Sequence, residues 1–113
     1  MRIWDLPPSR LCTRHLLAEH RELHAVWSVI TNNRRGYAHH PEVTRWRGRL
    51  LALYRRHQSL VREMHRRGWP AGTNHRTPLD VALAIGDAVQ STKVDSIAAQ
   101  KANLRAKACD CRV

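Results

Sequence analysis

The sequence predicts an all-α fold, a compact single domain of about three main helices with an extended N-terminal segment folded over the first helix. Apolar residues recur at steps of three and four along two long stretches, which is the spacing of one helix face. No stretch alternates as a half-buried strand does, and no internal repeat is present. We expect residues 1–113 to form one domain with one modest core, and residues 106–113 to be a mobile tail.

The first helix is expected over residues 9–33, with Ser9 as its N-terminal cap. Side chains three, four and seven residues apart share a helix face. The apolar stripe consists of Leu16, Leu23, Trp27 and Ile30, and a polar stripe consists of His15, Glu19 and Glu22. The segment before Pro7 can fold back over this helix and bring the α-amino group near the carboxylates.

The second helix is expected to begin at Pro41 and to end at Arg67, with Gly68 as the stop signal. Its buried stripe is predicted to be Val43, Trp46, Leu50, Leu53, His57, Leu60 and Met64. Its other faces carry Arg45, Arg47, Arg49, Arg55, Arg56, Arg62, Arg66 and Arg67. With only Glu42 and Glu63 opposing them, these arginines predict a surface that follows phosphates, although a solvated helix face has the same pattern.

The last third of the chain is less regular. Residues 69–76 are expected to form a loop, after which Thr77 and Asp80 mark a helix start as cap and first-turn acid. Its apolar face is predicted to consist of Val81, Ile85, Ala88 and Val89, and the pattern resumes with Val94, Ile97 and Leu104. One bent helix and two separate helices both fit this pattern.

Positive charge is concentrated in the first two thirds of the chain. The formal net charge is +11, and residues 1–76 hold fifteen arginines against five acidic residues. Coding bias in a GC-rich genome explains arginine over lysine, but not this excess over acids. A polyanion is the expected partner, most simply the backbone of double-stranded DNA.

The loop at residues 34–41 has the composition of a nucleic-acid contact, since it combines Arg34 and Arg35 with a glycine, Tyr37, His39 and His40. Such side chains suit a loop that approaches phosphates or wedges into a duplex. The alternative is a solvated connector in which Tyr37 packs on the core.

The three cysteines, Cys12, Cys109 and Cys111, do not form a disulfide framework, because their number is odd. A lone Cys-x-Cys lacks a second ligand pair, so metal binding there is the lesser alternative. No window is long and apolar enough to span a membrane, and the start lacks the apolar core of a signal peptide. We therefore expect a cytoplasmic, nucleoid-associated protein with no membrane contact and no obligate protein partner.

A family resemblance runs through the first helix and the start of the chain. The matching positions are Arg2, Ile3, His15, Leu16, Ala18, Glu19, Arg21, Glu22 and Leu23. In this phase, without a gap, the chain resembles the phage-type pyrimidine-dimer DNA glycosylases, the endonuclease V family. The resemblance is strong over the first quarter, weaker through the helix ending in Arg66-Arg67-Gly68, and absent beyond it.

The resemblance implies a DNA repair glycosylase with AP lyase activity on pyrimidine dimers or abasic sites, working without cofactor or metal. Met1 falls on the residue whose α-amine attacks sugar C1′ and forms a Schiff base, and Glu22 falls on the catalytic glutamate. α-Amino groups lose their proton more readily than lysine side chains, which favours such a nucleophile. The proposed DNA contacts are Arg2, His15, Arg21, Arg34, Arg35, His39, His40, Arg45 and Arg49.

The sequence departs from the family in ways that bear on substrate choice. Ala25 stands where the family has a second arginine, and no aromatic, basic tail follows Leu104.

Removal of the initiator methionine generally requires a small second residue, and Arg2 is large, so Met1 is expected to be retained.

Two other functions fit parts of the pattern. His20 and His24 have the i, i+4 spacing that can grip zinc, with His39 or His40 as a third ligand in a metal-dependent nuclease or hydrolase. A basic helical DNA-binding module without enzymatic activity would need only the charge.

Overall fold

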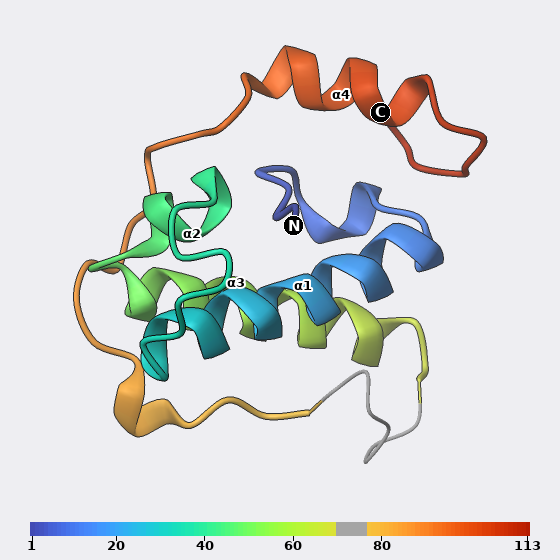
Figure 1. The fold of residues 1–113 in the computed structure, drawn as a ribbon. Coiled ribbons are helices and arrows are strands. Elements are labelled where there is room, and N and C mark those ends of the chain that lie inside the picture. Colours follow the sequence, from blue (N-terminus) through green and yellow to red (C-terminus); the bar gives the residue numbers. More distant parts are fainter. Residues whose placement is uncertain (70–76) are drawn as a thin grey trace.

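A computed structural model of the protein describes residues 1–69 and 77–113. Two antiparallel helices form the centre of the protein (Figure 1). These helices are α1 (Thr13–Thr31) and α3 (Leu50–Arg66), and they pack against each other. The remaining elements are a 3₁₀ turn at Pro8–Arg10, α2 (Pro41–Trp46), a 3₁₀ turn at Val81–Leu83 and α4 (Ile97–Arg105). The described residues contain no strand, which confirms the all-α prediction.

The core forms where the predicted apolar stripes meet. On α1, Leu16, Leu23 and Trp27 are buried, and Ile30 is half-buried against them. The predicted stripe of the second helical region is buried at every position: Val43, Trp46, Leu50, Leu53, His57, Leu60 and Met64. The helical periodicity therefore identified the core faces of α1, α2 and α3 correctly.

The first helix begins four residues later than predicted. The proline pair starts a 3₁₀ turn at Pro8–Arg10, Leu11 is extended, and Cys12 rather than Ser9 precedes the helix. Leu11 is buried, and the extended backbone at this position lets its side chain enter the core. The expected end is confirmed, because Asn32 caps the helix and Asn33 has a left-handed φ of 49°.

The second helix is two helices rather than one. α2 ends at Trp46 and α3 begins at Leu50, with Gly48 at a φ of 75° between them. A distant segment occupies the break: the Asp87 amide donates to the Gly48 carbonyl at 2.9 Å, and the Leu51 amide donates to the Ile85 carbonyl at 3.0 Å. These bonds satisfy backbone groups that a continuous helix would have paired internally.

The helix predicted to begin at Thr77 is absent. Asp80 caps only the short 3₁₀ turn, accepting from the Ala82 amide at 3.0 Å, and the chain then runs without helix to Ser96. The predicted apolar face is wrong, because Val81, Ile85 and Val89 are 64%, 67% and 71% exposed. The backbone of this segment instead forms hydrogen bonds with residues at the α2–α3 break. Most of the predicted loop at 69–76 lies outside the described residues.

The N-terminal segment lies between α1 and α4 (Figure 1). Ile3, Trp4 and Leu6 are buried, which confirms the expected segment folded over the first helix. α4 covers its other side: the Asp5 amide donates to Gln100 Oε1 at 2.8 Å, and Gln100 Nε2 donates back to Asp5 Oδ2 at 3.0 Å.

After α4 the chain folds back toward the start of α1. The Arg112 amide donates to the Arg10 carbonyl at 2.7 Å, and Arg105 Nε donates to the Val113 carbonyl at 2.6 Å. Mobility of residues 106–113 in solution stays a prediction. No helix in the described part of the chain is both long enough and apolar enough to cross a membrane.

Candidate active site

The Glu22 carboxylate is held directly against the beginning of the chain. The Arg2 amide donates to Glu22 Oε2 at 2.6 Å, and Met1 is half-buried at the edge of the core. The α-amino group belongs to the residue just before this amide. It is therefore only one residue removed from the carboxylate contact.

This arrangement follows from two periodicities. Alternate residues of an extended segment face the same side, whereas a helix presents residues three apart on one face. The Arg2 and Trp4 amides accordingly meet Glu22 and Glu19, the latter contact being 3.2 Å long. The polar stripe of α1 thus fixes the register of the N-terminal segment.

Glu19 is fully buried and is paired with Arg56 from α3. Arg56 Nε and Nη2 donate to its two carboxylate oxygens at 2.7 and 2.9 Å. Burial raises the pKa of the Glu19 carboxyl above its ordinary value, and Arg56 and the Trp4 amide act against that rise. Glu19 is therefore an anchor for the segment, while Glu22 remains half-buried.

A cavity of about 200 Å³ opens beside Glu22. Its walls include Arg2, Trp4, His15, Glu19 and Glu22 from the N-terminal half, and Asn103 and Lys107 from the C-terminal third. Asn103 and Lys107 were not predicted as site residues, because the C-terminal region has no counterpart in the resemblance. A carboxylate and basic side chains in one small hollow, one residue from the α-amino group, can support nucleophilic chemistry on an anionic substrate.

The Arg2 side chain is tied to the C-terminal region. Arg2 Nη1 donates to Asp95 Oδ2 at 2.6 Å, and its guanidinium lies 4.8 Å from the centre of the Trp4 ring. A phosphate contact by Arg2 would have to compete with Asp95.

The exposed basic groups predicted as DNA contacts are Arg21, Arg34, Arg35 and His39. His40 instead caps α2, with Nδ1 accepting from the Glu42 amide at 3.1 Å. Tyr37 is 68% exposed, so the alternative in which it packs on the core is wrong. The loop presents its ring and its arginines to solvent.

Several arginines of α2 and α3 are structural. Arg45 is buried, contacts Glu42 at 2.5 Å and Asp5 at 2.8 Å, and donates to the Ile3 carbonyl at 2.8 Å. Arg49 is half-buried and donates to the Arg45 carbonyl at 3.0 Å. The other arginines engaged with carboxylates are Arg56, Arg66 and Arg67.

The Glu-x-x-Arg spacing at residues 42–45 and 63–66 was the available signal for local ion pairs. The pairing of Arg56 with Glu19 had no local signal, since 37 positions separate them. The buried Arg45 is therefore not part of the predicted phosphate-following surface. Such a surface on the exposed Arg47, Arg55 and Arg62 stays a prediction.

Two groups of side chains have the composition of metal ligands. In the first, His57 Nε2 lies 3.1 Å from Nε2 of both His20 and His24, and 2.9 Å from the Thr77 carbonyl. Among the described residues, His57 rather than His39 or His40 completes this histidine group. Burial lowers the pKa of His24 and of His57, which favours neutral rings.

The second group includes a predicted DNA contact. His15 Nδ1 lies 3.1 Å from Cys12 Sγ and 3.2 Å from Cys111 Sγ. Its ring also meets the edge of Trp4, with 6.2 Å between ring centroids. His15 thus points toward sulfur atoms, which makes it a poor candidate for a phosphate contact.

Comparison with known proteins gives a family match. A family model described as pyrimidine dimer DNA glycosylase matches residues 1–77 of this 113-residue chain. No curated protein and no solved structure matches the chain. The matched range ends before α4 and before the segment that supplies Asn103 and Lys107.

Proposed function

The chain belongs to the pyrimidine dimer DNA glycosylase family, and on this premise we propose that it excises a damaged base from duplex DNA and then cleaves the strand as an AP lyase. Pyrimidine dimers and abasic sites are the proposed substrates. The observation that most supports the proposal is the 2.6 Å contact between the Arg2 amide and Glu22, which holds the residue next to the chain's first amine against a carboxylate.

The proposed first step is displacement at the sugar. The neutral Met1 amine attacks C1′, its nitrogen forms a bond to that carbon, and the bond between C1′ and the base breaks as the base leaves with a proton. The C1′–O4′ bond then opens and the nitrogen loses its proton, giving an imine. Loss of a proton from C2′ then breaks the C3′–O3′ bond and releases the 3′ phosphate.

Glu22 has two proposed tasks in this sequence. Its carboxylate stabilises the positive charge that develops at the sugar, and it transfers protons during imine formation. Its half-buried position and its bond from Arg2 keep it aimed at the cavity. A contact 1 Å longer would weaken both effects, because such stabilisation depends on fixed geometry.

The proposed DNA grip comes from Arg21, Arg34, Arg35 and His39, whose side chains are exposed. Arg2 joins them if a phosphate displaces Asp95. Reaching C1′ inside a duplex requires bending and extrusion of a base, and the exposed Tyr37 ring belongs to the loop proposed to approach the duplex. The proposed phosphate contacts do not include the buried Arg45.

Lys107 offers a competing amine, since it lines the same cavity as Glu22. The decisive experiment is therefore borohydride trapping of the imine on a duplex with one abasic site, and on a UV-irradiated duplex. We compare the natural chain, a chain with two residues added before Met1, Lys107→Gln and Glu22→Gln. Mass spectrometry of the trapped adduct identifies the modified peptide.

We expect an adduct on the N-terminal peptide, lost in the extended chain and retained in Lys107→Gln. Glu22→Gln preserves an acceptor for the Arg2 amide and should slow base release about 100-fold or more. Asp80→Asn is the control for removal of an exposed carboxylate. An adduct that survives the extension but disappears in Lys107→Gln would move the nucleophile to Lys107, and DNA binding without any adduct would indicate a passive binder.

A further inference from the structure

Potential metal ligands from both ends of the chain meet at the start of α1. We call them the Cys₃His cluster: Cys12, His15, Cys109 and Cys111. One nitrogen and three sulfur atoms of this cluster all lie within 4.8 Å of one another. Three thiols and one imidazole from opposite ends of the chain therefore meet at one place in the fold.

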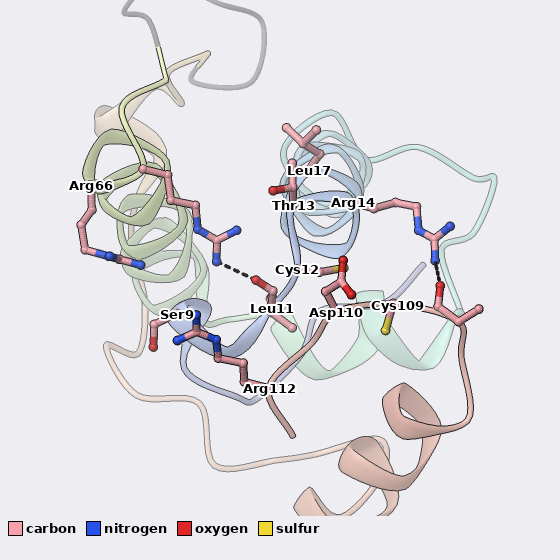
Figure 2. Close-up of a pocket in the computed structure, with 12 residues that line it drawn as sticks. Ser9, Leu11, Cys12, Thr13, Arg14, Leu17, Arg66, Cys109, Asp110 and Arg112 are labelled. Carbon is pink, nitrogen blue, oxygen red and sulfur yellow. Dashed lines mark hydrogen bonds between the residues drawn. The ribbon is translucent and has the colours of Figure 1, made fainter.

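The local structure aims these side chains at one point. Cys12 precedes α1 and His15 lies in its first turn, so their spacing of three places both on one face. The C-terminal segment passes this face and supplies the other two sulfurs. Figure 2 shows Cys12 at the beginning of α1 with Cys109 on the returning segment, which Arg14 also holds by donating to the Ala108 carbonyl at 3.0 Å.

We propose that the Cys₃His cluster binds one Zn²⁺ ion as a structural site. In tetrahedral zinc sites Zn–S is about 2.3 Å and Zn–N about 2.0–2.1 Å, which puts sulfur and nitrogen about 3.6 Å apart. His15 Nδ1 lies 3.1 and 3.2 Å from the sulfurs of Cys12 and Cys111, so these three atoms would need shifts of only a few tenths of an ångström around an ion. Cys109 Sγ, which donates to the Leu104 carbonyl at 3.4 Å, would give up that contact to become the fourth ligand. The donor set matches the Cys₃His class of structural zinc sites.

The surroundings fit a metal thiolate. The Cys12 amide donates to Cys111 Sγ at 3.1 Å, a contact that stabilises a negatively charged sulfur. Three thiolates and Zn²⁺ carry a net charge of −1, and Arg14 and Arg112 line the same cavity as Cys12 and Cys109. That cavity, of about 830 Å³, gives the ion a path from solvent, and the thiol protons leave to water on binding.

Four protein ligands leave no open position for substrate, so the ion would act on structure rather than on chemistry. It would fasten the C-terminal segment to α1 and thereby fix Lys107, two residues before Cys109, in the wall of the Glu22 cavity. This inference does not depend on the identity of the nucleophile. It assigns a role to a region that the family match does not cover.

The test uses the full chain purified under reducing conditions. Bound zinc is measured by plasma mass spectrometry, and cobalt is substituted for zinc to record its visible and near-ultraviolet spectrum. The variants are Cys111→Ser and Cys109→Ser. The matched control is His24→Gln, which removes a nitrogen from the histidine group and leaves the Cys₃His cluster intact.

We expect about one equivalent of zinc per chain, tetrahedral cobalt bands and a thiolate-to-cobalt charge-transfer band in the wild type. Each serine variant should lose most of the metal, and His24→Gln should keep it. A wild-type cobalt complex without the thiolate band overturns the proposal, even if the serine variants fail to fold. Metal lost in His24→Gln but retained in the serine variants also overturns it, as does a disulfide between two of the cysteines in the reduced protein.

Discussion

Arg56 forms a bidentate ion pair with the fully buried Glu19, and the same guanidinium donates to the Leu6 carbonyl at 2.8 Å. One side chain of α3 therefore holds both α1 and the N-terminal segment. The Trp4 amide completes the group by donating to Glu19. Because Arg2 and Trp4 lie on one side of the same extended segment, this ion pair also sets where the Arg2 amide meets Glu22.

Removing one member of the pair should strongly destabilise the protein. Arg56→Met leaves the Glu19 carboxylate buried without its cation, a change that typically costs about 3–5 kcal/mol. Urea unfolding at pH 7 measures the loss. The double variant Glu19→Gln/Arg56→Met, which buries no unpaired charge, should recover part of it, and a double variant no more stable than Arg56→Met would contradict the assigned role.

Acid should destabilise the protein through Glu63. A hydrogen bond from Arg66, with further help from Arg67, holds the pKa of the Glu63 carboxyl below its ordinary value of 4.5. A carboxyl with a lowered folded pKa contributes stability above the unfolded value and loses it as the pH falls through the folded value. We therefore expect the free energy of unfolding to fall below about pH 4.5.

The matched variant for this effect is Glu63→Gln. It should be less stable than the wild type at pH 7, by about 1–3 kcal/mol, and its stability should depend less on pH in the acid range. Urea titrations at pH 3, 4, 5 and 7 make the comparison. Parallel pH curves for the two proteins would show that Glu63 does not carry the acid response.

The sequence predicted the core faces well because periodicity is a local property. Val43, Trp46, Leu50 and Leu53 keep their helical spacing through the α2–α3 break, and all four are buried. The same regularity hid the break, since the spacing is uninterrupted where the helix is not. The break depends on backbone hydrogen bonds of Ile85 and Asp87. The sequence near Gly48 contains no pattern that predicts these bonds.

The candidate site likewise contains residues that the sequence predicted and residues that it did not. Met1, Arg2 and Glu22 were predicted because a fixed phase between the terminus and a helix is visible in the sequence. Asp95, Asn103 and Lys107 were not, because their approach depends on how α4 returns over the N-terminal segment. The approach of His15 to Cys111 was not predicted for the same reason.

A methyl group at Gly86 should disrupt the α2–α3 break. Gly86 has a φ of 90°, and a Cβ there would lie 2.3 Å from the Gly48 carbonyl oxygen. Gly86→Ala should therefore cost more than the roughly 1–3 kcal/mol typical of backbone strain alone. Thermal unfolding measures the change, with Gly36→Ala as the control because nothing lies within 4 Å of its added Cβ. Equal midpoints for the two variants would contradict the packing argument.

The loop arginines should contribute sequence-independent affinity for DNA. Arg34 and Arg35 are exposed at the turn after α1, between two residues of positive φ, Asn33 and Tyr37. Each phosphate neutralised in duplex DNA adds about 0.9 to the slope of log affinity against log salt concentration. If both side chains contact phosphates, Arg34→Gln/Arg35→Gln should flatten that slope by about 1.8.

Fluorescence anisotropy with an undamaged duplex at several salt concentrations measures the slope. Arg105→Gln is the control, since Arg105 is an exposed arginine in the nearly neutral C-terminal third and donates to the Val113 carbonyl. Its slope should equal that of the wild type. Because every duplex carries the same backbone charge, the double variant should weaken binding to damaged and undamaged DNA alike. A loss confined to damaged DNA would instead place the loop at the lesion.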